Sequence, residues 1–270
     1  MSFKINQLLN FNDNLPKIIC KLALVKGMGN FGKYILMLTV ILTRPKKWSI
    51  FLKRLFDEIS GIGINSIPIV ALMSTFIGGV IALQTASNMS NPLLPKYTVG
   101  YITQSSTILE FSPTIISLIL AGKVGSNIAS EIGTMRVTEQ IDALEIMGVN
   151  SLNFLVLPKI AAAVLFFPIL VIISMFLSIT GGWLALVLSD LSTTDTYVLG
   201  IRYSFMPYHI VYALTKTIVF GFIIVSVASY YGYYVKGGSL EVGKSSTQAV
   251  VISSVFILIA NFLLTQMMLL

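Results

Sequence analysis

Three polar residues lie deep inside long apolar stretches of this sequence, where side chains that carry charge or strong hydrogen bonds are rare. Glu110, Lys216 and Asn261 each lie about nine residues from the outer end of such a stretch, which is about 14 Å at 1.5 Å per residue. Ionisable groups inside a membrane are costly and usually mark a functional site. We hypothesise an ion pair between Glu110 and Lys216 with Asn261 beside it. The alternative is that Glu110 faces a water-filled vestibule while Lys216 extends its ammonium toward the surface.

The segment 238–245 fits the phosphate-loop pattern G-x-x-x-x-G-K-S, in which backbone N–H groups cradle phosphates. Its surroundings argue against nucleotide binding. The preceding apolar stretch is long enough to cross a bilayer, and the 25 residues after Ser245 contain no acidic residue to hold magnesium. We therefore expect no ATPase in this chain, and an active transporter of this kind would need a partner or an ion gradient as its energy source.

Other chemistry is poorly supported by the residue types. His209 is the single histidine and Cys20 the single cysteine. No intrachain disulfide is therefore possible, and the sequence contains no cluster of histidine and cysteine residues that would predict a metal site. An intramembrane enzyme would need a nucleophile–base pair or metal ligands at depth. The sequence thus indicates no catalytic residue, no bound cofactor and no metal site.

The composition predicts an all-α integral membrane protein. Of the 270 residues, 55% are hydrophobic and only 11% are charged, with a mean hydropathy of +0.86, whereas soluble domains carry about a quarter charged residues. The net charge of +7 reflects topology rather than nucleic-acid binding. More than half of the 18 lysine and arginine residues precede residue 62, which predicts a cytoplasmic N-terminus.

Five apolar stretches are long enough to be transmembrane helices. They cover about 62–87, 101–121, 155–188, 207–234 and 249–270. Residues 1–61 form an N-terminal cytoplasmic or interfacial region, in which apolar residues at helical spacing over 15–25 predict an amphipathic helix at the membrane surface. Residues 62–270 form the membrane domain. Five crossings that start inside place the polar segment 123–153 inside and the C-terminus outside.

The segment 121–148 is polar, glycine-punctuated and helix-prone, unlike the sequence around it. Glu139, Asp142 and Glu145 are spaced by three residues and would share one flank of a helix. Ile141, Leu144 and Met147 would form the neighbouring flank. Such a cytoplasmic coupling helix could dock into a groove on a partner protein. The alternative is a solvated amphipathic helix.

Two long strings of sequence carry a family resemblance. LEFSPTIISLILAGKVGSNIASEIGTMRVTEQIDALEIMGVN, at 109–150, and GYYVKGGSLEVGKSSTQAVVISS, at 232–254, resemble the MlaE/YrbE permeases, the membrane subunits of ABC systems that move lipids across the bacterial envelope. The chain departs from the family pattern at Lys123, where arginine is common, and at Asn261, where some relatives carry an acid.

The resemblance implies a homodimer in the bacterial inner membrane, with its C-terminus in the periplasm. It further implies a cytoplasmic ABC ATPase subunit docked on the polar segment, a periplasmic substrate-binding subunit of the MCE type, and a phospholipid or related lipid as cargo. The ATPase-coupling residues would be Arg136, Glu139, Gln140, Asp142 and Glu145. Glu110, Lys216 and Asn261 would form a polar patch in the lipid pathway.

A different class of function also fits some of these residues. In a stand-alone secondary transporter of an amphipathic substrate, Glu110 and Lys216 would couple ions or protons. Such transporters are commonly built from internal repeats, and the sequence shows none.

Overall fold

The computed structural model describes residues 31–41, 48–89 and 95–269. The chain divides into two units, Met1–Arg44 and Pro45–Leu270. The described part of the first unit is a short apolar helix, Phe31–Ile41. The amphipathic helix expected over 15–25 lies outside the described residues.

The described residues of the second unit form helices joined by short turns and loops. Its first membrane-spanning segment, Trp48–Asn88, contains α2 (Trp48–Glu58), η1 (Ile59–Gly63), η2 (Ile64–Ser66) and α3 (Ile67–Asn88). Its second, Thr98–Val137, contains α4 (Thr98–Ser106), η3 (Thr107–Ile115), α5 (Ile116–Leu120), η4 (Ala121–Gly125) and α6 (Ser126–Val137). The segments η1, η3 and η4 are π-helical, and η2 is a 3₁₀ turn.

The remaining membrane-spanning helices are α8 (Ser151–Leu188), α10 (Pro207–Tyr233) and α11 (Ser239–Leu269), and the short helices α7 (Gln140–Ile146) and α9 (Thr194–Tyr203) lie in the connections. Five helical segments in the described residues are thus long and apolar enough to cross a membrane, which confirms the all-α membrane fold. Four of them extend beyond the predicted apolar stretches, because helical turns that are less apolar continue them at one end or both. The domain boundary at residue 62 stays a prediction.

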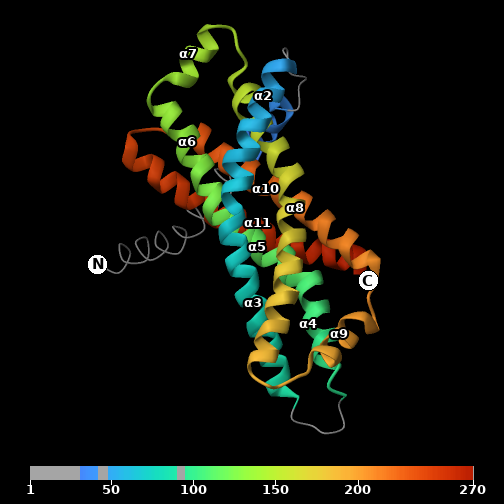
Figure 1. Ribbon diagram of the computed structural model, residues 1–270. Helices are drawn as coiled ribbons and strands as arrows, with labels where there is room; N and C mark the ends of the chain where they lie inside the picture. The colour runs from blue at the N-terminus through green and yellow to red at the C-terminus, as the bar shows by residue number, and fades with distance from the viewer. Residues whose placement is uncertain (1–30, 42–47, 90–94, 270) are drawn as a thin grey trace, which may run out of the picture. The chain divides into compact units, whose positions relative to one another are not determined.

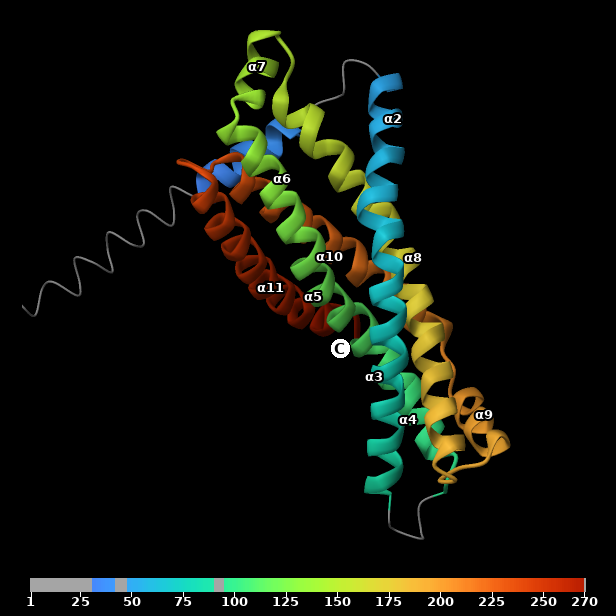
Figure 2. The same cartoon turned by 60° about the vertical axis from the view of Figure 1, so that its left-hand side comes forward.

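Two groups of helices make up the second unit. The pair α3 and α8 runs side by side over most of its length, while α6, α10 and α11 pack against one another at a tilt to that pair (Figures 1 and 2). Helix α10 also contacts α8 and so joins the groups. Helices α7 and α9 lie at opposite ends of the unit, and both views agree on this.

Small residues allow α3 and α8 to approach closely. Ser74 Oγ donates a hydrogen bond to Ser174 Oγ at 2.8 Å, and Ser178 Oγ donates to the backbone oxygen of Ser74 at 2.8 Å. A β-carbon on Gly78 would overlap the carbonyl group of Ser178. Lipid supplies no hydrophobic force between helices, so close packing and hydrogen bonds of this kind hold them together.

The α9 end of this pair is fastened by one tyrosine. Tyr197 is buried against Ala82, Val99 and Leu186, and its hydroxyl donates a hydrogen bond to the backbone oxygen of Ile179 at 3.0 Å. Because the tyrosine comes from α9 and its neighbours come from α3, α4 and α8, this contact fixes the short helix to the end of the spans.

We expect Gly78→Ala to destabilise the protein and Gly79→Ala to leave its stability nearly unchanged. The added methyl of Gly78→Ala would push against backbone, and overpacking costs about 1–3 kcal/mol. The methyl of Gly79→Ala would meet Ala185 Cβ at an ordinary 3.4 Å. The two neighbouring glycines share the same helix, so each variant controls for the other. Equal unfolding temperatures in detergent would contradict the close α3–α8 contact.

Candidate functional site

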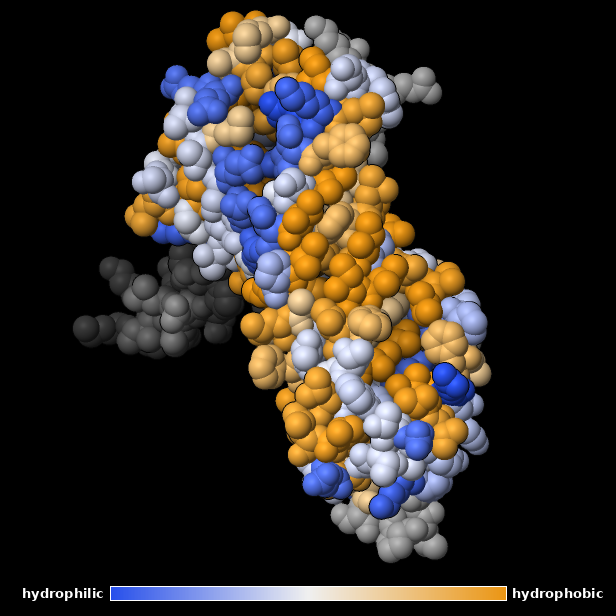
Figure 3. Space-filling model, in the orientation of Figure 1, coloured by the Kyte–Doolittle hydropathy of each residue, from blue (hydrophilic) through white to orange (hydrophobic). Residues whose placement is uncertain are grey.

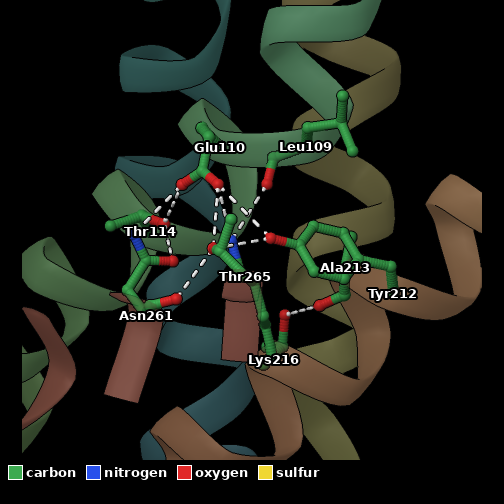
Figure 4. A network of polar contacts seen from close by, with 9 residues as sticks. Leu109, Glu110, Thr114, Tyr212, Ala213, Lys216, Asn261 and Thr265 are labelled. Atoms are coloured by element: carbon green, nitrogen blue, oxygen red, sulfur yellow. Dashed lines mark hydrogen bonds and ion pairs between the residues drawn. The ribbon is translucent and has the colours of Figure 1, made fainter. Parts of the chain in front are cut away.

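The structure brings the three predicted intramembrane residues together (Figure 4). Lys216 Nζ lies 2.7 Å from Glu110 Oε1, and Asn261 Nδ2 donates a hydrogen bond to Glu110 Oε2 at 3.1 Å. Glu110 belongs to η3, Lys216 to α10 and Asn261 to α11, so the carboxylate joins three spans. We call these three residues the polar patch. Its role in a lipid pathway stays a prediction.

Three further side chains complete the network around the carboxylate, and sequence reasoning missed them. Thr114 Oγ1 donates to Glu110 Oε2 at 3.3 Å, while Tyr212 OH and Thr265 Oγ1 each lie 3.4 Å from Glu110 Oε1. Thr114 and Thr265 lie four residues beyond Glu110 and Asn261, on the same helix faces. The four-residue spacing could have identified both threonines as neighbours of the patch. It is a weak signal, because uncharged polar residues are common in membrane helices.

A proline shapes the π-helical segment that carries Glu110. Pro113 has no backbone N–H, so it cannot donate to the carbonyl of Leu109 four residues earlier. Lys216 Nζ donates to that carbonyl oxygen at 3.4 Å, in addition to its contact with Glu110. The same ammonium lies 4.3 Å from the centre of the Tyr212 ring, a distance that permits a cation–π attraction.

The two charges of the patch differ in their exposure. The Lys216 side chain is 0% exposed, whereas the Glu110 side chain is 42% exposed. A buried ammonium needs its counter-charge, because the apolar surroundings cannot hydrate it. The Glu110 side chain therefore remains partly accessible beside the patch, although both of its carboxylate oxygens accept hydrogen bonds.

At the other end of the second span, the polar segment folds differently from the expected single helix flank. Helix α6 ends at Val137, and Glu139 adopts a left-handed backbone conformation with φ 58° before α7 begins. Glu139 therefore precedes α7 and does not share its flank with Asp142 and Glu145. The three-residue spacing is helical in form, but the left-handed turn breaks the helix.

The two other acids of this segment are held by partners within the chain. Arg136 Nη1 contacts Asp142 Oδ1 at 2.6 Å across the turn. Tyr233 OH and Ser151 Oγ donate hydrogen bonds to Glu145 Oε1 at 2.8 and 2.9 Å. These hydrogen bonds, from Tyr233 first and then Ser151, lower the pKa of Glu145. They tie α7 to the ends of α10 and α8.

The apolar face of α7 also differs from the expected one. Ile141 is fully buried within the protein, so it cannot contact a partner. Ile146 and Met147 are 87% and 67% exposed, and Glu139 and Gln140 are exposed as well. We call Glu139, Gln140, Ile146 and Met147 the α7 surface. Sequence reasoning did not identify Ile146, because it followed a three-residue spacing from Ile141, which selects Leu144 and Met147.

A second buried lysine lies near the α7 end of the spans and was not predicted as a site. Lys159 Nζ contacts Glu58 Oε1 at 2.6 Å and Glu131 Oε2 at 2.8 Å, and its side chain is 3% exposed. These residues belong to α8, α2 and α6. Nearby, the Arg54 guanidinium lies 3.6 Å from the centre of the Phe154 ring. The cluster fixes α6, which leads into α7, to two other helices.

Neither a metal site nor a phosphate loop is formed by the described residues. No group of three or more His, Cys, Asp or Glu side chains among them is placed to hold a metal ion. Most of the segment 238–245 is α-helical, because α11 begins at Ser239, so it does not form the loop that would cradle phosphates.

Comparisons with known proteins identify the family of this chain. The family model described as Permease MlaE matches residues 55–267. A probable ABC transporter permease protein from Rickettsia bellii is 37% identical over 261 residues, which cover 96% of this chain and 98% of that protein. The chain belongs to the MlaE permease family.

Relatives of this MlaE-family permease extend beyond that genus. A probable ABC transporter permease protein from Synechocystis is 35% identical over 213 residues, which cover 78% of this chain and 80% of that protein. The Arabidopsis thaliana protein named Protein TRIGALACTOSYLDIACYLGLYCEROL 1, chloroplastic, is 31% identical over 233 residues, which cover 84% of this chain and 64% of that protein. The permease is thus the membrane subunit of an ABC transporter and not an enzyme, which disfavours the stand-alone secondary transporter.

We expect the permease to lose more stability when the anion of the polar patch is removed than when its cation is removed. Glu110→Gln leaves the buried Lys216 without its counter-charge and is expected to cost about 3–5 kcal/mol. Lys216→Met leaves a carboxylate that keeps its hydrogen bonds from Asn261 and Thr114, so it should cost less. The double variant should be less destabilised than the sum of the two single variants. Unfolding in detergent measures all three, and additive effects would show that the contact contributes nothing.

We expect Glu145 to make the stability of the MlaE-family permease depend on pH. Because its folded pKa is lowered, its hydrogen bonds stabilise the folded protein above the unfolded value of about 4.3, and this contribution is lost as the pH falls through the folded pKa. Glu145→Gln should flatten this part of the unfolding profile at acidic pH, below about pH 5. The exposed Glu139→Gln is the matched control, and equal profiles for the two variants would contradict the assignment.

Proposed function

We propose that this permease subunit moves phospholipids or related lipids between the inner membrane and the outer envelope, driven by a separate ATPase. The observation that carries this proposal is the polar patch, a half-exposed carboxylate with a buried ammonium among apolar spans. An amphipathic cargo suits such surroundings, because its headgroup can meet the patch while its chains lie along apolar side chains. The Arabidopsis relative is named after trigalactosyldiacylglycerol, a glycerolipid, and this name supports a lipid cargo.

The ATPase would dock on the α7 surface, with Arg136, Asp142 and Glu145 as supporting residues that hold α7 in place. Ile146 and Met147 supply exposed apolar area at the end of a membrane protein, where a soluble partner can cover it. Glu139 and Gln140 would border this apolar centre with polar contacts. This division follows the usual anatomy of protein interfaces, which have an apolar centre and a polar rim.

A second copy of the permease would cover α11. Only 11% of the most apolar part of α11 is buried, against 56% for α10, so α11 has the larger face free for lipid or for a partner helix. The N-terminus would lie in the cytoplasm and the C-terminus in the periplasm of a bacterium. A periplasmic subunit of the MCE type would receive or deliver the lipid at the α9 end.

We expect the double variant Ile146→Glu/Met147→Glu to lose the co-purifying ATPase. Burying one such side chain contributes about 1.5–3 kcal/mol, so two carboxylates in their place should weaken the association by at least about tenfold. The tagged permease is purified in mild detergent with its partners, and ATPase activity and bound phospholipid are measured in the same preparation.

Leu199→Glu is the matched control, because Leu199 is 62% exposed on α9 at the opposite end. The proposal predicts a co-purifying ATPase, which the α7 variant loses and the control keeps, together with phospholipid in the extract. A permease that retains its ATPase in the α7 variant would rule out docking on the α7 surface. A preparation without phospholipid, or one that moves lipid in vesicles without any ATPase, would overturn the proposed function.

A further inference from the structure

A pocket of about 600 Å³ opens between the first and second spans, on the α7 side of the polar patch. Its walls come from η1 and η2, from η4 and α6, and from Ser246 of α11. Lys123 follows Glu110 by thirteen residues along the same span, which places it roughly 20 Å away. The pocket is therefore separate from the polar patch. Figure 3 shows a band of hydrophilic residues over α6 and the neighbouring first span, beside a large hydrophobic surface.

No described carboxylate forms an ion pair with the charge in this pocket. Ten described residues line it, and Lys123 is the one charged residue among them. The two buried lysines of the described chain each have a carboxylate within 3 Å: Lys216 has Glu110, and Lys159 has Glu58 and Glu131. Lys123 Nζ instead donates a hydrogen bond to the backbone oxygen of Asn65. An ammonium has three N–H donors, so two remain for a ligand.

Further hydrogen-bond donors line the same space. The side chains of Asn65, Asn127 and Ser130 make no hydrogen bond to another described residue. In contrast, the hydroxyl of Ser246 is engaged, because it donates to the backbone oxygen of Ser126 at 3.0 Å. One unneutralised cation with two amides and a hydroxyl is a donor set for an anion with several oxygen atoms, because charge-assisted hydrogen bonds are the strong ones.

The backbone around the pocket is irregular and carries little side-chain bulk. Two of its walls, η1 and η4, are π-helical, and such segments are often found at functional sites. A β-carbon on Gly61 would meet no other atom within 4 Å. A ligand therefore has room beside Lys123, and a side chain can be introduced at Gly61 without displacing the protein.

We propose that this pocket binds a phosphate group, with Lys123 as its charge partner and Asn65, Asn127 and Ser130 as hydrogen-bond donors. The phosphate can come from a phospholipid headgroup or from a free phosphate ion. If it comes from a lipid, the inference rests on the proposed function and adds a second headgroup site to the pathway, between α7 and the polar patch. Binding of free phosphate does not depend on that function.

The test measures binding of three probes to the purified permease in detergent by native mass spectrometry and by the shift in unfolding temperature. The probes are dioctanoyl phosphatidylglycerol, dioctanoylglycerol, which has the same chains without phosphate, and inorganic phosphate. Lys123→Gln should weaken binding of the phosphate-bearing probe by at least about tenfold, since it removes a charged hydrogen-bond donor. Lys123→Arg keeps the charge and should restore most of the binding.

Two further variants separate a binding role from a structural one. Gly61→Asp leaves Lys123 in place but adds a carboxylate to compete for it, and should weaken binding as Lys123→Gln does. Lys244→Gln removes a lysine that is exposed and paired with Glu241, and should change nothing. Phosphatidylglycerol binding without phosphate binding would identify a lipid headgroup site, whereas equal binding of inorganic phosphate would identify a site for the free ion.

The proposal is overturned if dioctanoylglycerol binds as well as its phosphate-bearing counterpart, or if Lys123→Gln and Gly61→Asp leave binding unchanged. Its failure can be told apart from failure of the proposed function. If the permease transports no lipid but binds phosphate through Lys123, only the proposed function is rejected. If it transports phospholipid and both variants bind the probes unchanged, only this inference is rejected.

Discussion

A charge among these helices must find its partner inside the protein, because the hydrocarbon core of a membrane cannot hydrate it. The described helices obey this constraint at two depths. Lys216 is fully buried against Glu110, and Lys159 is nearly fully buried between Glu58 and Glu131. Each lysine joins helices that are distant in sequence, so the ion contacts also determine which spans lie together. Lys123 is exposed and has no carboxylate partner among the described residues, so its pocket is the place where an external anion would meet it.

The two ion clusters also hold the same helical segment at two different positions. Glu131 of α6 is held by Lys159, and Glu110 of η3 is held by Lys216, while both acids belong to the span Thr98–Val137. Its last helix, α6, leads through a tight turn into α7, which Arg136 fastens through Asp142. A force applied to α7 by a docked partner would therefore pass along this span to both clusters.

Hydropathy was sufficient to predict the five spans, and the equal depth of Glu110 and Lys216 was sufficient to suggest their contact. The sequence pattern could not show the left-handed turn at Glu139, because three-residue spacing looks the same whether or not the helix is continuous. It could not reveal the Lys159 cluster either. Lys159 and its two partners come from three different helices, and each residue alone resembles an ordinary charge at the end of a span.

Three π-helical segments of the described chain lie in the first two spans. The helices α8, α10 and α11 are assigned as regular α-helices, whereas η1, η3 and η4 interrupt the two spans that contribute Gly61, Glu110 and Lys123 to the sites. A π-helical turn gives up the best backbone geometry and persists where its surroundings stabilise it. The regular helices supply those surroundings: α8 contacts η1 and η3, and α10 and α11 contact η3 and η4. The regular helices thus support the irregular spans, and they also contribute Lys216 and Asn261 to the polar patch.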